Sequence, residues 1–184
     1  ITDIVSTDSN LTDYEALPEI QTRLQQRQCT PGEHYVDAGY MSGPNLAKSI
    51  EKQIDLIGPL ASAVTAQDLI TDGMTQAQFQ VDLQKKSVTC PQGQRVGSPI
   101  RKEQGVLFKF PTQVCAVCPV RSRCCTGKEG RTIRVSEHYD LMQQARARQK
   151  TQAFKQDYAK HRSGVEGSLS ALTRGNGMRV SGGR

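Results

Sequence analysis

The chain has 184 residues, enough for one sizeable core or for one core with a smaller inserted module. Its apolar fraction is 36%, it contains no Trp, and its mean hydropathy is -0.54. The longest apolar run, near residues 56–64, is far shorter than the roughly 20 residues that span a bilayer. The composition therefore argues against a membrane-spanning protein.

The net charge of +6 is unevenly distributed along the chain. Residues 1–100 contain 7 Lys/Arg and 12 Asp/Glu, whereas residues 101–184 contain 17 Lys/Arg and 6 Asp/Glu. Lys and Arg that neutralise phosphates release counterions, so the second half predicts a polyanionic partner. The alternative is a solvated basic helix face with no partner.

The first sixty residues alternate short apolar runs with helical patterns. Residues 1–5 read as the end of a strand, and a helix follows in which Leu17, Ile20 and Leu24 recur at helical spacing. Parallel βαβ units are expected from the elements that come next, because the connections are short. These elements are a strand over His34–Asp37, a helix opened by Pro44 and a strand over Ile54–Ile57.

From about residue 60 the pattern changes to turn residues and short strands. Strands are expected near 79–83 and 106–110 and at 132–135, and this segment contains five of the six cysteines. A long basic helix then runs to about Lys160, and a second helix follows from Arg162. We expect three segments: an α/β part over 1–59, a cysteine-rich β insertion over 60–135 and terminal helices over 136–184.

Two carboxylates are placed where a phosphoryl-transfer site would need them. Asp37 closes an apolar strand, and ligands of open α/β sheets bind outside the carboxyl ends of strands. Glu166 lies four residues after Arg162, on the same helical face. The alternatives are an Asp37 that only caps the Ala38-Gly39 turn and a Glu166 in an ordinary ion pair with Arg162.

The cysteine spacing points to a structural metal. Cys115-x2-Cys118-x5-Cys124 supplies three thiols and Cys90 a fourth, and Zn²⁺ takes four such ligands in tetrahedral geometry. His138 is the one histidine near enough in sequence to replace a cysteine. Free thiols, an iron–sulfur cluster and disulfides remain alternatives.

The two remaining cysteines have no place in this metal site. Cys125 follows directly after Cys124, and neighbouring cysteines rarely share one metal, so we read it as a spare thiol. Cys29, at the end of the first helix, is expected to be a small buried apolar residue.

Three segments, in chain order, resemble the DDE class of insertion-sequence transposases. They are YVDAGY at 35–40, CAVCPVRSRCC at 115–125 and RSGVEG at 162–167. The resemblance covers nearly the whole chain and is to the branch with a cysteine cluster between the second Asp and the Glu. It implies a ribonuclease-H-like mixed sheet flanked by helices, with a small cysteine-rich β insertion.

The resemblance also assigns roles. Asp37 matches the family's second catalytic carboxylate, Glu166 the third, and Arg162 the basic residue near the active site, with Tyr158 in the same helical run. The carboxylates would bind Mg²⁺ or Mn²⁺, and Zn²⁺ would be structural. The family's first catalytic Asp has no counterpart: ITDIVSTDSNLTD resembles the third strand and its loop, and the chain therefore reads as a fragment.

The function implied is that of a transposase catalytic domain. The complete form would bind transposon-end DNA as a dimer on paired ends, then cut and rejoin strands, in a bacterial cytoplasm and in association with the nucleoid. The fragment alone, with two of three carboxylates, is expected to be inactive. The rival interpretation is a zinc-stabilised nucleic-acid-binding protein or a domesticated transposase remnant without catalysis.

Overall fold

The computed structural model describes residues 13–61 and 64–175, and within the last helix it describes side chains only as far as Arg162. These residues fall into two compact units, one formed by 13–61 with 140–175 and the other by 64–139. Neither range includes a helix that is both long enough and apolar enough to cross a bilayer.

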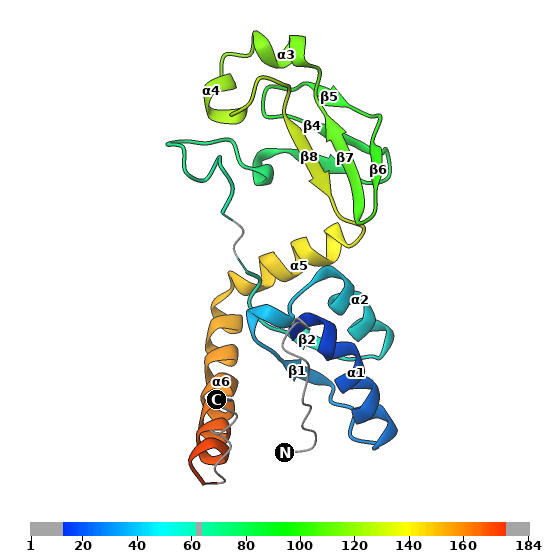
Figure 1. The fold of residues 1–184 in the computed structure, drawn as a ribbon, viewed down its shortest axis with the longest axis vertical. Helices are drawn as coiled ribbons and strands as arrows, with labels where there is room; N and C mark the ends of the chain where they lie inside the picture. Colours follow the sequence, from blue (N-terminus) through cyan, green and yellow to red (C-terminus); the bar gives the residue numbers. More distant parts are fainter. Residues whose placement is uncertain (1–12, 62–63, 176–184) are drawn as a thin grey trace, which may run out of the picture. The chain divides into compact units, whose positions relative to one another are not determined.

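The first unit is built around a parallel βαβ element, as the sequence predicts (Figure 1). Strands β1 and β2 pair in parallel, with His34 opposite Leu56. Helix α2 begins after Ser42, whose hydroxyl accepts a hydrogen bond from the Asn45 amide at 3.3 Å, and Pro44 favours the first turn. The elements are α1 (Asp13–Gln26), β1 (Glu33–Tyr35), η1 (Ala38–Tyr40), α2 (Gly43–Glu51) and β2 (Asp55–Ile57).

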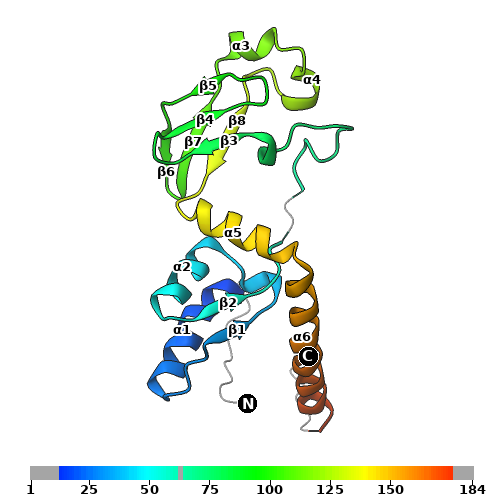
Figure 2. The same ribbon diagram turned by 180° about the vertical axis from the view of Figure 1, so that it is seen from behind.

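The apolar core of this unit lies between the βαβ element and the helix that follows the second unit. Its buried members come from α1, α2 and β2 and from the segments that directly follow β1, η1 and β2. Helix α5 contributes Leu141, Met142 and Ala145, which pack against them. Figure 2 shows α1 and α2 beside the two strands. The buried members are Leu17, Val36, Met41, Leu46, Leu56 and Leu60.

Pro18 lies inside α1, in its second turn. Proline has no amide hydrogen, so the carbonyl of Tyr14, four residues earlier, loses its helical partner. The side-chain amide of Asn45 on α2 replaces that partner, donating to Tyr14 O and to Tyr40 O, each at 2.8 Å. Asn45 is 2% exposed, so its two donated bonds are made in the core.

Asn45→Ala should therefore lower the free energy of unfolding by about 2 kcal/mol, because it removes two partly buried hydrogen bonds. In a Pro18→Ala background the helix can supply a donor to Tyr14 O, and the cost of Asn45→Ala should fall by about 1 kcal/mol. Urea unfolding of the four proteins of this double-mutant cycle measures both values. If Asn45→Ala lowers the free energy of unfolding equally in both backgrounds, the Asn45 side chain does not replace the amide donor that Pro18 lacks.

The terminal helices break at a different place from the one predicted. Helix α5 covers Tyr139–Gln149 and α6 covers Gln152–Gly175, so the break falls at 150–151 and the chain continues as helix through 160–162. Thr151 explains the break, because its hydroxyl accepts a hydrogen bond from the Phe154 amide at 3.2 Å and caps α6. The single helix expected to reach Lys160 is therefore wrong.

The second unit consists of two small antiparallel sheets, with strand orders β3-β4-β5 and β6-β7-β8. The strands expected near 79–83 and 106–110 and at 132–135 are confirmed as β3, β7 and β8. The short helices η2 (Gln76–Gln78), α3 (Thr112–Ala116) and α4 (Arg121–Cys124) complete the unit. The strands are β3 (Gln80–Asp82), β4 (Ser87–Thr89), β5 (Arg95–Val96), β6 (Ile100–Lys102), β7 (Gly105–Lys109) and β8 (Thr132–Val135).

Side chains alternate between the two faces of β7 and β8, and those on one face are buried in the core of this unit. Phe108 pairs with Ile133 in the β7–β8 register, and both are at most 2% exposed. Phe79 and Phe110 meet edge to face with their ring centroids 5.8 Å apart. Two cysteines, Cys115 and Cys124, belong to the same core. The α/β class is confirmed by the two units together, and the ribonuclease-H-like topology stays a prediction.

Candidate active site

Asp37 is held at the carboxyl end of the first strand. Val36, the residue before it, is buried, and its amide donates to Ile57 O at 2.8 Å, which extends the pairing with β2 by one residue. The backbone then turns into η1, where the Tyr40 amide donates to Asp37 O at 3.0 Å. The turn is held by this backbone bond, and the Asp37 side chain makes no capping hydrogen bond. The carboxylate is therefore left for another partner.

That partner is Tyr158 on α6. Its hydroxyl lies 3.2 Å from Asp37 Oδ1 and 3.1 Å from Val36 O, so a single phenolic proton is shared between the strand backbone and the carboxylate. The Phe154 ring, one turn earlier, stacks on Tyr158 with centroids 5.6 Å apart and an interplanar angle of 4°. Through these contacts Tyr158 joins α6 to the residues at the end of the strand.

Arg162 also approaches Asp37. Its Nη1 lies 3.8 Å from Asp37 Oδ1, and the two side chains are 53% and 68% exposed. Contacts from Tyr158 and Arg162 both fall on Oδ1, whereas Oδ2 accepts no hydrogen bond from the described residues. Glu166 lies in α6 four residues beyond Arg162, about 6 Å along the helix axis. Its side chain lies outside the described part of the structure.

A second tyrosine–aspartate pair joins β1 and α6 in the opposite sense. The Tyr35 hydroxyl, on the strand, donates to Asp157 on the helix, and the Tyr35 ring stacks on His161 with centroids 4.0 Å apart. The hydrogen bond to Asp157 raises the pKa of Tyr35, and burial and the bond to Glu33 act in the same direction. Sequence reasoning missed this pair, although Tyr35 lies only two residues before Asp37.

The ionisation of Tyr158 reports on the site. Burial raises its pKa, the charge of Asp37 and its hydrogen bond raise it further, and Arg162 acts in the opposite direction. We expect Asp37→Asn to lower the pKa of Tyr158 and Arg162→Gln to raise it. NMR titration of ¹³Cζ-labelled tyrosine measures both, with Tyr158→Phe assigning the signal. A pKa that Asp37→Asn leaves unchanged or raises would show that the carboxylate does not face the phenol.

The described residues include no group of three or more His, Cys, Asp or Glu side chains already arranged to hold a metal ion. The site around Asp37 is accordingly a one-carboxylate arrangement as far as it is described. The side chains of Asp3, Asp8 and Asp13, the acidic residues of the N-terminal segment, lie outside the described part, as does that of Glu166.

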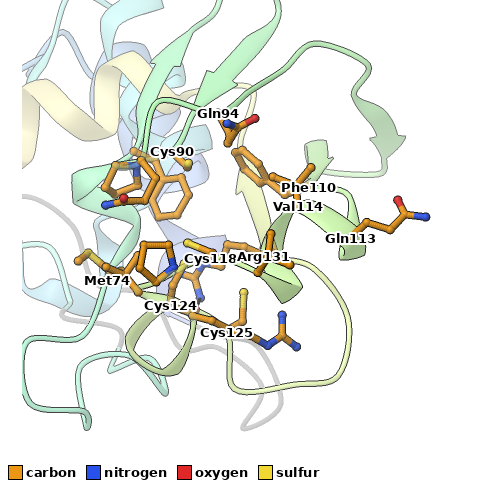
Figure 3. A pocket seen from close by; sticks show the side chains of 18 residues that line it. Met74, Cys90, Gln94, Phe110, Gln113, Val114, Cys118, Cys124, Cys125 and Arg131 are labelled. Atoms are coloured by element: carbon orange, nitrogen blue, oxygen red, sulfur yellow. Dashed lines mark hydrogen bonds between the residues drawn. The ribbon is translucent and has the colours of Figure 1, made fainter.

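The cysteines of the second unit surround one cavity of about 510 Å³. Cys90 follows β4 at the tip of a hairpin, where the Cys90 amide donates to Gln94 O and Gly93 adopts a φ of +79°. Figure 3 shows Cys90 on one side of the cavity, and Cys118, Cys124 and Cys125 on the other. The remaining lining cysteine is Cys115, in α3, where the Cys118 amide donates to its carbonyl.

These thiols are free, without disulfide bonds. Burial raises the pKa of Cys124, and raises that of Cys125 to about 12, with the neighbouring Cys124 and Cys115 adding to the latter. A cation would therefore have to displace protons from these sulfurs. The expectation for Cys29 is wrong: it is exposed, and its thiol donates to Arg27 O at 3.3 Å.

Comparison with known proteins finds one family. A family model described as "Transposase DDE domain" matches residues 89–182, half of the chain. The matched range includes the cavity cysteines, Tyr158, Arg162 and Glu166, and it begins after Asp37. No curated protein matches the chain. No solved structure matches it either.

Proposed function

The chain belongs to the transposase DDE domain family, and from this premise we propose that it forms part of a site that cuts and joins DNA strands with divalent cations. The observation that carries the proposal is the contact of two α6 side chains with Asp37, at the end of β1. Tyr158 and Arg162, which lie about two turns and one turn before Glu166 on α6, both contact Asp37 Oδ1. The strand-end carboxylate and the helix of the Glu are therefore adjacent.

Asp37 and Glu166 are the residues that would hold the cation, Mg²⁺ or Mn²⁺. Asp37 fits this role, because its carboxylate is 68% exposed and no side chain in the described part of the chain donates a hydrogen bond to Oδ2. When bound, the cation would activate the attacking oxygen and stabilise the leaving one. Tyr158 fixes the orientation of Asp37 through its hydroxyl, and Arg162 supplies a cationic fork that suits a DNA phosphate.

The family's first carboxylate has no counterpart that we recognise in these 184 residues. We therefore propose that the chain on its own binds DNA without cutting it. Strand cleavage by the purified chain in Mg²⁺ or Mn²⁺, abolished by Asp37→Ala, would refute this proposal and direct the search to Asp3, Asp8 and Asp13. As a complete transposase, the protein would act on paired transposon ends as a dimer.

We also propose that Cys90, Cys115, Cys118 and Cys124 bind one structural Zn²⁺. Support comes from their convergence on one cavity, from the β4–β5 hairpin and the α3–α4 segment, in a unit whose strands are two to five residues long. The sulfurs are not yet in metal-binding positions in the structure described here, so binding would draw the hairpin of Cys90 and the α3–α4 segment together.

DNA binding is expected to involve the exposed cations of α5 and α6 and to lose affinity steeply with salt. Lys155→Gln with Lys160→Gln should reduce the slope of log Kd against log salt concentration by about 2, one for each phosphate contact. Fluorescence anisotropy with a labelled duplex measures the slope. Arg148, although basic, is excluded because it holds Asp55 with both guanidinium nitrogens, at 2.7 and 2.9 Å.

Arg148→Gln is therefore the matched control: it should destabilise the packing of α5 on β2 and leave the salt slope unchanged. If the double lysine variant behaves like wild type, the helices are not the DNA-binding surface. The rival function, a zinc-stabilised nucleic-acid-binding protein without catalysis, predicts the same binding, but it predicts that a protein supplied with the missing carboxylate would remain unable to cleave.

A further inference from the structure

The positive charge of the chain is concentrated in the second unit. Residues 62–139 contain 11 Lys/Arg and 6 Asp/Glu, whereas the rest of the chain contains 13 and 12. The second unit is therefore basic in its own right, in addition to the cations of α5 and α6.

Three of these cations line one groove. The groove has a volume of about 390 Å³ and runs between the β3–β4 turn, which contributes Lys86, and the β6–β7 hairpin, which contributes Arg101 and Lys102. Its floor is apolar, formed by Val106, Phe108 and Val135 from β7 and β8, together with smaller contributions from the turn. Glu137 is the one acidic residue of the lining.

Backbone geometry holds the hairpin in place. Gly105 opens β7 with a φ of +119°, and a Cβ at this position would lie 2.2 Å from Val135 O. Only glycine allows the hairpin to lie so closely against β8. In the register of β6 and β7, Arg101 is opposite Val106, so its side chain is on the side of the sheet that faces the groove floor.

The three cations are exposed and make no ion pair with any carboxylate in the described residues. Other cations of the same unit differ: Lys85 lies 3.7 Å from Asp82, and Lys109 pairs with Glu129. Three cations around one groove raise the positive potential there, and an anion bound in the groove lowers the energy of that arrangement. The groove therefore suits a ligand that places negative charge against the cations at the rim and an apolar surface against the floor.

We propose that this groove binds the sugar–phosphate backbone of DNA, as a second contact surface separate from α5 and α6. The inference rests on the proposed function, which makes DNA the partner. A phosphate would lie against Arg101 and Lys86, because a guanidinium binds phosphate through two parallel hydrogen bonds. The sugar would cover the apolar floor near Phe108.

The test compares two triple variants of the whole chain by fluorescence anisotropy with a short labelled duplex of arbitrary sequence, over a range of salt concentrations. The groove variant carries Lys86→Gln, Arg101→Gln and Lys102→Gln. The control variant removes the same charge elsewhere, through Lys48→Gln, Arg123→Gln and Lys128→Gln. The groove variant should reduce the salt slope by about 2 to 3, and the control by less than about 1.

Each outcome has one meaning. Equal slopes for the two variants, with DNA binding intact, would overturn the groove and leave the proposed function standing. No DNA binding by the wild-type chain would remove both. If polyglutamate displaces DNA as well as unlabelled duplex does at equal charge, the groove is an acidic-peptide surface and the proposal is wrong. If the groove variant has a lowered Tm, Arg101→Gln alone replaces it in the test. This single variant should change the slope of log Kd against log salt concentration by about 0.9.

Discussion

Chelation of the purified protein should release about one zinc per chain and unfold residues 64–139. Zinc bound by four thiolates contributes a free energy on the order of 10 kcal/mol, which is as large as the whole stability of a typical domain. The unit that holds the cysteines has a small core, centred on Phe79, Phe108 and Phe110. Elemental analysis gives the stoichiometry, and NMR before and after chelation shows which unit unfolds.

Cys118→Ser is the decisive variant for this prediction. Cys118 is half-buried and outside the apolar core, so serine there should cost little unless a metal ligand is lost. Cys115 and Cys124 are core residues, whose replacement destabilises the fold with or without zinc. Cys29→Ser, at an exposed thiol, is the matched control and should keep full zinc content. A folded chain without zinc, or identical behaviour of Cys118→Ser and Cys29→Ser, would end the zinc hypothesis.

The second large effect concerns catalysis. In a form of the protein that cleaves transposon-end DNA in Mg²⁺, Asp37→Asn and Glu166→Gln should each lower the rate by about 10³-fold or more, since each removes a charged ligand that stabilises the transition state. DNA affinity should change little. Single-turnover cleavage assays separate the chemical step from binding.

Asp55→Asn is the matched control for the carboxylate variants. Asp55 also lies on a strand of the same small sheet, but at its start, where it pairs with Arg148. It should reduce stability while leaving the cleavage rate within a few-fold of wild type. Cleavage that survives Asp37→Asn would place the catalytic carboxylates elsewhere in the chain.

Local signals predicted much of the first unit. The short strand of His34, the proline-opened α2 and the apolar β2 follow from alternation and turn residues, and βαβ connections of this length are parallel. The break at 150–151 was missed because a basic, polar sequence runs through it without a Gly or Pro. A capping threonine is a weaker signal of a helix break than Gly or Pro. Thr151 is identified as the cap only by the hydrogen bond that the Phe154 amide donates to it.

The long-range part of the site could not be derived from spacing. Tyr35 and Asp157 are 122 residues apart, and nothing in either local pattern indicates that one donates to the other. Tyr158 raises a similar difficulty, since its contact with Asp37 depends on how α6 packs on β1. A count of charges by halves of the chain has the same limit, because it cannot distinguish the small sheets of the second unit from the terminal helices, which share the cations of the second half almost equally.

The central claim, that Asp37 and Glu166 share a divalent cation, is tested most directly by Mn²⁺ binding to the ¹⁵N-labelled chain. With two carboxylates the affinity should be weak, on the order of 10⁻⁴ to 10⁻³ M. Paramagnetic broadening should centre on the amides around Asp37 and around Glu166, and both Asp37→Asn and Glu166→Gln should abolish it. Broadening centred on another acidic group, or unaffected by these two variants, would contradict the account.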